Sequence, residues 1–284
     1  MIILMTILML VLVYIAWQRW ELSRFEVTKY QIRSHKLKEP ASVAVIADLH
    51  GFTYGEGNSR LLRKVADIAP QAILVPGDLL VSKYPQTYET AYEVLKNLAG
   101  IAPVYYSYGN HESRLQDPEC MNFPLFEQYM EKVRALGVHV LGTESRSISL
   151  GNNQVMLSSL ELELEYYEKG TIVPMDGSYM QEHLPFRNPG MFQILLAHNP
   201  AYAEQYAAWG ADVTFCGHNH GGLVRIPGIG SLVSPQLTLF PKYDAGRFEI
   251  GGRQVLVSRG LGTHTFHVRV FNRAELMAVE FLPE

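Results

Sequence analysis

The sequence predicts a layered α/β domain preceded by an apolar N-terminal helix. From Ser42 onward, short β-rich runs alternate with helical patterns, which is typical of strands joined by crossover helices. Residues Met1 to Trp17 are apolar except for Thr6. The chain of 284 residues is 48% hydrophobic and 18% charged, so it contains enough apolar material for a core without disulfide bonds.

The N-terminal apolar run is long enough to span a membrane, which takes about 20 residues. We expect a single-pass transmembrane anchor over residues 1–20, a juxtamembrane linker over 21–41 and one globular domain over 42–284. A cleaved signal peptide is the alternative, but it normally has basic residues before the apolar run and a small-x-small site after it, and neither is present. The basic residues from Arg19 to Lys38 predict that the domain lies on the cytoplasmic side.

Three β-rich runs in the first half end in polar residues that precede a candidate helix. These runs are Ser42 to Ala47, Ala72 to Pro76 and Pro103 to Tyr108. The helices after them carry apolar stripes, typical of core packing, formed by Leu61, Leu62, Val65 and Ile68, by Tyr88, Leu95 and Leu98, and by Phe126, Met130 and Val133. The polar residues therefore lie at the carboxyl ends of strands.

The second half predicts two further strands, Gln193 to Ala197 and Asp212 to Cys216, with a helix from Ala201 to Trp209 between them. Short strands are then expected at Val224 to Ile226, Ser231 to Val233, Val255 to Val257 and Leu276 to Phe281. The segment from Glu161 to Asn188 begins with alternating Leu and Glu and then becomes rich in Tyr, Pro and Gly. It predicts a surface strand followed by a loop, and a substrate-shaping lid is the alternative.

Charge and cysteine content argue against general nucleic-acid binding and against a structural thiolate site. The formal net charge of −4 gives no broad basic surface, so general nucleic-acid binding is disfavoured. The chain has only two cysteines, Cys120 and Cys216, and we expect both to be free thiols. Neither has metal-ligand spacing to another cysteine, which argues against a structural thiolate site.

Five polar clusters at the ends of apolar runs have the composition of metal ligands. They are Asp48-Leu49-His50, Gly77-Asp78, Gly109-Asn110-His111-Glu112, His198-Asn199 and Gly217-His218-Asn219-His220. Residues two apart in an extended chain face the same side, so Asp48 with His50, and His218 with His220, can each direct two ligands into one pocket. Sites in open α/β sheets lie beyond the carboxyl ends of strands, where the first three clusters fall.

Each cluster alone has an ordinary structural explanation. A single Asp after a strand often caps a helix, and Gly109-Asn110 is also a hairpin signal. The occurrence of all five clusters in one chain favours a shared metal site over five unrelated turns.

The order D-x-H, G-D, G-N-H-E, H and G-H-x-H resembles the calcineurin-like metallophosphoesterase family over about Val43 to Phe281. The resemblance implies a four-layer α/β/β/α sandwich whose domain 42–284 is catalytic and holds two metal ions at the strand ends. It assigns Asp48, His50 and His220 to one metal and Asn110, His198 and His218 to the other, with Asp78 bridging them.

Two later segments, 240–246 and 258–263, are similar to a bacterial, often membrane-associated branch of that family. The sequence departs from the family pattern at Val81, where an Asp is common, and at Asn219, where this branch commonly has Thr. Neither position is an expected ligand. The departures therefore bear on substrate preference more than on metal binding.

The implied reaction is phosphodiester or pyrophosphate hydrolysis. Two divalent ions lower the pKa of a shared water and neutralise the phosphoryl oxygens, so that hydroxide attacks phosphorus. The resemblance assigns His111 to stabilising or protonating the leaving oxygen. Glu112 is expected to orient His111, with helix capping as its alternative role. The O/N ligand set without thiolate suits Mn, Fe or Zn.

The expected substrate is lipid-linked or nucleotide-linked, and UDP-diacylglucosamine is a candidate within the resemblance, because an anchor would hold the site near an acylated substrate. The anchor alone does not select that substrate. Two other functions are weighed against this one. A catalytically silent metal-binding scaffold would be expected to lose ligands, which this chain retains, and a nuclease is disfavoured by the acidic charge balance.

Overall fold

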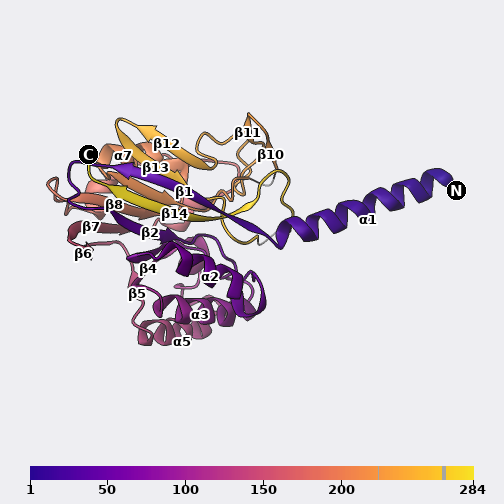
Figure 1. The fold of residues 1–284 in the computed structure, drawn as a ribbon, viewed down its shortest axis with the longest axis horizontal. Helices are drawn as coiled ribbons and strands as arrows, with labels where there is room; N and C mark the ends of the chain where they lie inside the picture. Colours follow the sequence, from indigo (N-terminus) through magenta and orange to yellow (C-terminus); the bar gives the residue numbers. More distant parts are fainter. Residues whose placement is uncertain (223, 264–266) are drawn as a thin grey trace.

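Two β-sheets packed face to face, with helices outside, form the body of the computed structural model, which describes residues 1–222, 224–263 and 267–284 (Figure 1). The first sheet has the order β1 (Phe25–Arg33), β14 (Ala274–Leu282), β2 (Ala41–Val45), β3 (Ala72–Val75), β4 (Val104–Ser107) and β5 (His139–Leu141). The second has the order β12 (Gly246–Ile250), β13 (Arg253–Val257), β9 (Val213–Cys216), β8 (Phe192–Ala197), β7 (Asn153–Leu160) and β6 (Glu144–Leu150). A small ribbon pairs β10 (Arg225–Ile226) with β11 (Gly230–Ser231).

Each sheet contains four consecutive strands that run parallel to one another. In the first sheet β2, β3, β4 and β5 run parallel, and in the second β7, β8, β9 and β13 do. Parallel strands present their carboxyl ends at one edge of a sheet, and functional sites of α/β proteins form there.

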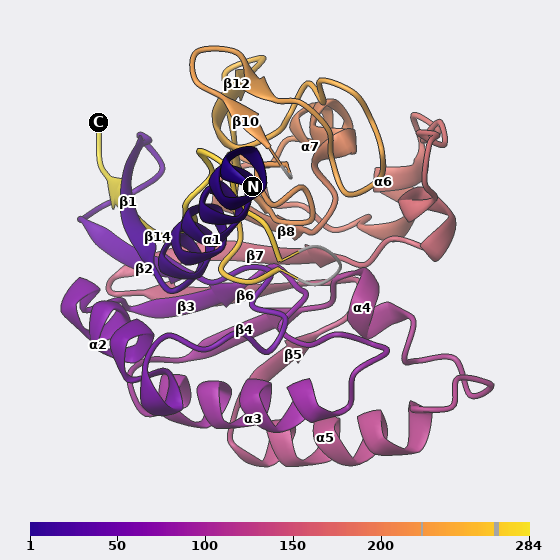
Figure 2. The same ribbon diagram turned by 90° about the vertical axis from the view of Figure 1, so that its right-hand side faces the viewer.

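Helices cover the outer face of each sheet, giving four layers (Figure 2). The first sheet is covered by α2 (Ser59–Ile68), α3 (Gln86–Ala99) and α5 (Phe123–Ala135), and the second by α6 (Tyr179–His183) and α7 (Ala203–Trp209). Short 3-10 turns are η1 (Glu56–Asn58), η2 (Leu164–Tyr167) and η3 (Pro200–Tyr202). The predicted α/β/β/α sandwich is confirmed.

Strand β2 shows how the sequence produces these layers. Val43 and Val45 pack in the core between the sheets, whereas Ala44 and Ile46 pack against the helices, because successive side chains in a strand point to opposite faces. Both faces are buried, so the strand reads as a continuous apolar run.

The expected strands and helices of the core are present, and their ends lie within two residues of the predicted ones. The prediction of a surface strand that begins at Glu161 is wrong. Strand β7 ends at Leu160, and the chain continues irregularly into η2. Tyr166 and Tyr167 are buried against the core of the second sheet, so packing rather than the Leu-Glu alternation decides the local structure. Cys120 and Cys216 are free thiols, as predicted.

The segment 21–41, predicted to be a linker, contains strand β1. All nine residues of β1 pair in parallel with β14, and Ile32 is buried between the sheets. The basic residues of this segment suggested a membrane flank. Two of them, Lys29 and Arg33, occupy exposed positions of this edge strand, where charged side chains are common.

Helix α1 (Ile2–Leu22) projects from the body, and its length and apolar composition suit either a membrane anchor or a secretory signal (Figure 1). Its last turns contact the body. Gln18 donates a hydrogen bond to the backbone oxygen of Arg269 at 3.2 Å and accepts one from its N–H at 3.0 Å. Glu21 is buried and pairs with Arg24 at 2.9 Å and with Arg273 at 3.3 Å. The base of α1 is therefore fixed to the domain by polar contacts.

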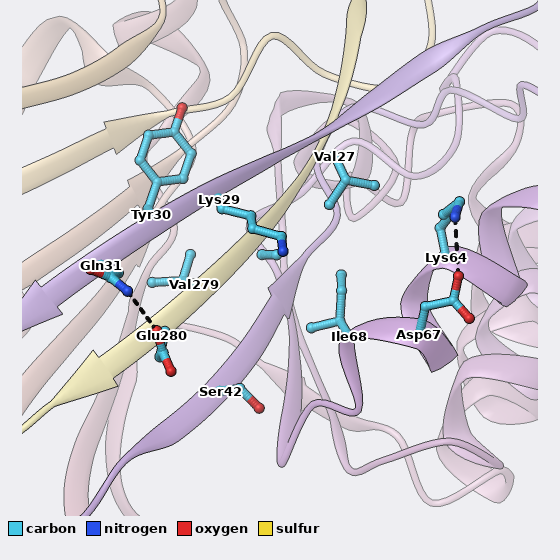
Figure 3. A pocket seen from close by; sticks show the side chains of 11 residues that line it. Val27, Lys29, Tyr30, Gln31, Ser42, Lys64, Asp67, Ile68, Val279 and Glu280 are labelled. Carbon is cyan, nitrogen blue, oxygen red and sulfur yellow. Dashed lines mark hydrogen bonds and ion pairs between the residues drawn. The ribbon is translucent and has the colours of Figure 1, made fainter.

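A groove of about 450 Å³ lies along β1 and β14 beside α2 (Figure 3). Its lining is mixed, with Val27 and Ile68 beside Lys29, and with the bonded pair Gln31 and Glu280 at 2.9 Å. This groove does not include any of the predicted site residues.

Candidate metal centre

The predicted ligands lie in loops at the carboxyl ends of strands from both sheets. Asp48 and His50 follow β2, Asp78 follows β3, and Asn110 begins α4 (Asn110–Ser113) after β4. From the second sheet, His198 follows β8, while His218 and His220 follow β9. All seven side chains are buried and converge on one region between the sheet ends.

Five of these seven residues have a left-handed backbone. The φ angles are 51° for Asp48, 49° for His50, 58° for Asp78, 65° for His218 and 49° for His220. The prediction that Asp48 with His50, and His218 with His220, lie on extended chain is wrong, because β2 ends at Val45 and β9 ends at Cys216. Left-handed conformations of non-glycine residues are disfavoured and concentrate at functional sites, where the surrounding structure maintains them.

One cluster consists of Asp48, His50 and His220. The Nε2 atoms of His50 and His220 are 3.0 Å apart, and Nε2 of His220 is 3.6 Å from Oδ1 of Asp48. Their candidate ligand atoms all lie within 4.8 Å of one another. The spacing is that of side chains that could hold one metal ion.

The second cluster consists of Asp78, His198 and His218, with Asn110 beside it. Nε2 of His198 is 3.1 Å from Oδ2 of Asp78, and Nδ1 of His218 is 2.9 Å from Oδ1 of Asn110. Asp78 also approaches the first cluster, since its Oδ2 is 3.8 Å from Nε2 of His50. Asp78 therefore lies between the two clusters. His218 and His220 belong to different clusters, so this pair does not serve one ion as a unit.

Backbone carbonyls orient three of the imidazoles. Nδ1 of His198 is 2.7 Å from the oxygen of Pro76, Nδ1 of His220 is 3.0 Å from that of Gly262, and Nδ1 of His50 is 3.3 Å from that of Leu80. A carbonyl only accepts, so each Nδ1 carries the hydrogen. In the neutral ring each Nε2 then presents its lone pair to the cluster, which is the arrangement that metal-binding histidines adopt.

The donor set fits a cation. The facing lone pairs of His50 and His220 repel each other unless a proton or a metal ion lies near both. In the described part of the chain, buried Oδ2 of Asp48 has no hydrogen-bond partner. Burying a carboxylate oxygen without a hydrogen-bond partner costs free energy. A cation bound here would interact with this oxygen and also relieve the repulsion between the two histidines.

The charges of the clusters perturb one another. Burial raises the pKa of Asp48 to about 7, against the opposing effect of His198. Burial also acts to raise the pKa of Asp78, but the positive charges of His198 and His111 hold it well below its ordinary value. For His198 burial lowers the pKa, while the charge and hydrogen bond of Asp78 outweigh it and raise the pKa to about 9. Protons on Asp48 and His198 therefore compete with a cation, and metal binding should strengthen as pH rises.

His111 lies at the edge of the clusters. Its Nδ1 accepts a hydrogen bond from the backbone N–H of Ser82 at 3.0 Å, so in the neutral ring Nε2 carries the proton. The backbone N–H of His111 donates to Oδ1 of Asp78 at 2.9 Å, and the ring centroid of His111 is 5.0 Å from that of His50. His111 can therefore contribute a proton next to Asp78, although its distance to His50 and Asp78 also suits a ligand.

The carboxylate of Glu112 binds backbone N–H groups of two neighbouring loops. It accepts hydrogen bonds from the N–H groups of Asp78, Leu79 and Gly109, each at 2.9 Å, and from the hydroxyl of Tyr106 at 2.7 Å. The hydrogen bond from the N–H of Gly109 caps α4, so Glu112 has the helix-capping role that was predicted as the alternative to orienting His111. Burial and the charge of Asp78 raise the pKa of Glu112 to about 7, although these hydrogen bonds lower it. Glu112 ties the loops after β3 and β4 together and thereby positions Asp78 and Asn110.

We expect Glu112→Gln to lower the free energy of unfolding by about 2 to 4 kcal/mol, because the amide leaves buried N–H donors without an acceptor. Urea unfolding measures this change. Glu144→Gln is the control, since Glu144 forms a half-exposed ion pair with Arg146 and should change stability by less than about 0.5 kcal/mol. Unchanged stability with reduced kcat would instead indicate that Glu112 acts on His111.

Glycines next to the ligands permit the close approach of the loops. A Cβ at Gly217 would lie 2.6 Å from Oδ2 of Asp48. Gly109 likewise leaves room for the carboxylate of Asp78. Side chains at these positions would displace the two aspartates, which explains why glycine precedes His218 and Asn110.

A cleft of about 410 Å³ opens over the second cluster and contains functional candidates that the sequence did not reveal. Asp78, Asn110, His111 and His218 line its floor. The walls include the cationic residues Lys83, Arg114 and Lys169, together with Tyr84, Tyr167 and Gln236. Tyr167 stands edge-on to His218, with ring centroids 5.0 Å apart. The three cations come from separate loops, so no local sequence pattern could identify them. They give the cleft the charge that an anionic substrate requires.

The fold and the clusters define an α/β protein with adjacent Asp/His groups that could hold metal ions at the strand ends. The chain belongs to the calcineurin-like phosphoesterase family, which matches residues 41–222. Members of this family are typically dimetal-dependent, so the chain is a metal-dependent phosphoesterase.

Several known proteins are similar to this chain. Phosphodiesterase YaeI of Escherichia coli strain K12 is 25% identical over 91% of this chain and 88% of its own length. The uncharacterized protein YpbG of Bacillus subtilis strain 168 is 26% identical over 85% of this chain and 81% of its own length. The structure of phosphopantetheinyl hydrolase from Mycobacterium tuberculosis is 12% identical, covers 78% of this chain and 89% of that chain, and has a TM-score of 0.47.

Proposed function

We propose that the chain hydrolyses a phosphodiester or pyrophosphate bond with two divalent metal ions held by the seven clustered side chains. Asp48, His50 and His220 would hold the first ion. The second would be held by Asn110, His198 and His218, and Asp78 would bridge the two. The observation that carries this proposal is the position of Asp78 between both clusters, within 3.1 Å of His198 and 3.8 Å of His50.

The ligand chemistry narrows the metals to those that accept mixed carboxylate, amide and imidazole ligands, namely Mn, Fe or Zn. When bound, the two ions would activate a water and neutralise the phosphoryl group. The chain's own residues act around them. Lys83, Arg114 and Lys169 attract and hold the anionic substrate, and His111 supplies the proton that the leaving oxygen needs.

The similarity to Phosphodiesterase YaeI supports a diester over a monoester. Helix α1 supports a membrane anchor, with the domain on the cytoplasmic side because basic residues follow the apolar segment. An anchored enzyme suits a lipid-linked or nucleotide-linked substrate, such as UDP-diacylglucosamine.

The test uses the full chain in detergent with bis-p-nitrophenyl phosphate as a soluble diester. Chelation should abolish turnover, and Mn²⁺ should restore it. Reloading should be more complete at pH 8 than at pH 6, because Asp48, whose pKa is raised to about 7, loses its competing proton between these two pH values. Absence of turnover with Mn²⁺, Fe²⁺ and Zn²⁺ would reject the proposal and favour a metal-binding scaffold. Unchanged turnover in excess chelator would reject the metal requirement.

A further inference from the structure

Exposed apolar side chains gather in three loops beside the base of α1. We refer to Ile226, Ile229, Leu237, Leu239, Phe240 and Phe271 as the apolar rim. Ile229, Leu239 and Phe271 expose more than two thirds of their surface, at 68%, 69% and 68%. Single exposed apolar residues are ordinary, but a group of large ones on one surface marks an interaction site.

Backbone contacts join the three loops into one surface. Val224 forms a parallel bridge with Val270, and the N–H of Arg225 donates to the oxygen of Val270 at 3.1 Å. The N–H of Phe240 donates to the oxygen of Leu232 at 3.0 Å. The residues of the rim are therefore held relative to one another and do not belong to independent tails.

This surface is continuous with the base of α1. Gln18 bonds twice to the backbone of Arg269, and Glu21 pairs with Arg273, so Phe271 lies between two residues that contact the last turns of the helix. Trp17 and Trp20 flank Gln18, at the height where aromatic side chains meet a membrane interface. The ribbon of β10 and β11 lies at the end of the body from which α1 projects (Figures 1 and 2).

The backbone at the rim is unusual in the same way as at the metal clusters. Leu237, Phe240 and Phe271 have φ angles of 64°, 46° and 50°, which bulky side chains rarely adopt. All three side chains are exposed. A disfavoured backbone that exposes a large apolar side chain is not explained by core packing, and it points to a function outside the folded domain.

We propose that the apolar rim inserts into the interface of the lipid bilayer that α1 spans. This inference rests on the proposed membrane anchor. An anchored helix fixed to the domain through Gln18 and Glu21 places the rim at the membrane surface. Apolar side chains there enter the boundary between headgroups and acyl chains, to a depth of about 5 to 10 Å.

The rim also determines where the cleft opens. Pro235 and Gln236, which line the cleft, directly precede Leu237 of the rim. The oxygen of Gln236 accepts a hydrogen bond from the N–H of Gly170 at 2.7 Å, next to the cleft residue Lys169. Insertion of the rim therefore brings the mouth of the cleft to the lipid headgroups. The substrate class that fits this geometry is a phosphoester carried by a membrane lipid.

The experiment measures membrane depth in the full chain. Four variants are made in a Cys120→Ser background, in which the remaining Cys216 is buried, and each is labelled with a small fluorophore. They are Phe240→Cys, Phe271→Cys, Phe186→Cys and Leu10→Cys. The protein is placed in nanodiscs of phosphatidylcholine and phosphatidylglycerol that contain nitroxide-labelled lipids. Phe186 is the matched control, because its exposure of 61% is close to that of Phe240 at 59%. It also precedes the amino end of β8, whereas His198 follows the carboxyl end.

We expect lipid quenching at 240 and 271 to exceed that at 186 by roughly threefold or more, and the label at 10 to be quenched by mid-chain nitroxides. Equal quenching at 240, 271 and 186, with position 10 quenched, would overturn insertion of the rim and leave the anchor in place. Lack of quenching at position 10 would overturn both. Turnover of the soluble diester by the same samples reports the proposed activity independently of either result.

Discussion

Asp78→Asn is expected to lower kcat/KM for a soluble phosphodiester by about 10³-fold and to reduce the bound metal from two ions per chain to one or none. The Asp78 carboxylate faces His198 at 3.1 Å and His50 at 3.8 Å. Asparagine retains an oxygen that can accept the N–H of His111, so the loop geometry should survive. The substitution removes the negative charge of Asp78, which would reduce the repulsion between two cations held by the neighbouring residues.

Metal analysis of the dialysed protein and steady-state kinetics check this prediction together. Asp212→Asn is the control, because Asp212 is also a mostly buried carboxylate, paired with Lys36 and Arg253, but lies at the start of β9, away from the clusters. It should retain both ions and near-normal kcat. If the Asp78 variant kept two ions and more than a tenth of the activity, the bridging role would be wrong.

The strand ends next to the site could be predicted because the buried strands are easy to recognise in the sequence. Strands β2, β3 and β4 are buried on both faces, so each appears as a continuous apolar run, and the polar residue that ends each run is conspicuous. The family pattern then assigned the residues to two ions. The structure brings six of these residues together in adjacent Asp/His groups and places His218 and His220 in different groups, and the assignment of the residues to two ions stays a prediction.

The backbone of the site could not be predicted from local preference. Asp48, His50 and Asp78 adopt left-handed conformations, which are uncommon for any residue other than glycine even though Asp and His adopt them more readily than most. Contacts between loops maintain them, because the N–H of Asp48 donates to the oxygen of Gly77 and that of His50 to the oxygen of Asp78. Such contacts arise only once β2 and β3 are paired.

Strand β1 was missed for a related reason. Its charged residues resemble a membrane flank, and its partner β14 lies at the opposite end of the chain, with Phe25 paired to Ala274. A single edge strand with mixed polarity carries little periodic signal, and long-range pairing leaves none in the local sequence. A truncation intended to remove only the anchor should therefore retain residues from Phe25 onward.

His111→Asn should reduce kcat strongly for an alkyl phosphodiester and weakly for an aryl one. Nδ1 of His111 accepts the N–H of Ser82, which leaves the proton on Nε2. General acid catalysis contributes about 10²- to 10⁴-fold when the leaving group needs a proton, whereas a nitrophenolate leaves without one. We expect a loss of about 10³-fold for the alkyl ester and less than about tenfold for the nitrophenyl ester.

The metal content of the His111 variant decides between its two possible roles. His111 lies close enough to His50 and Asp78 to act as a ligand, and loss of an ion would lower turnover of both esters equally. Retention of two ions together with a leaving-group-dependent loss would identify His111 as the proton donor. Ser82→Ala is the matched control, because the backbone N–H that fixes the tautomer remains while the hydroxyl 3.1 Å from Nδ1 is removed. It should preserve most of the activity on either ester, since orientation of the imidazole depends chiefly on the backbone bond.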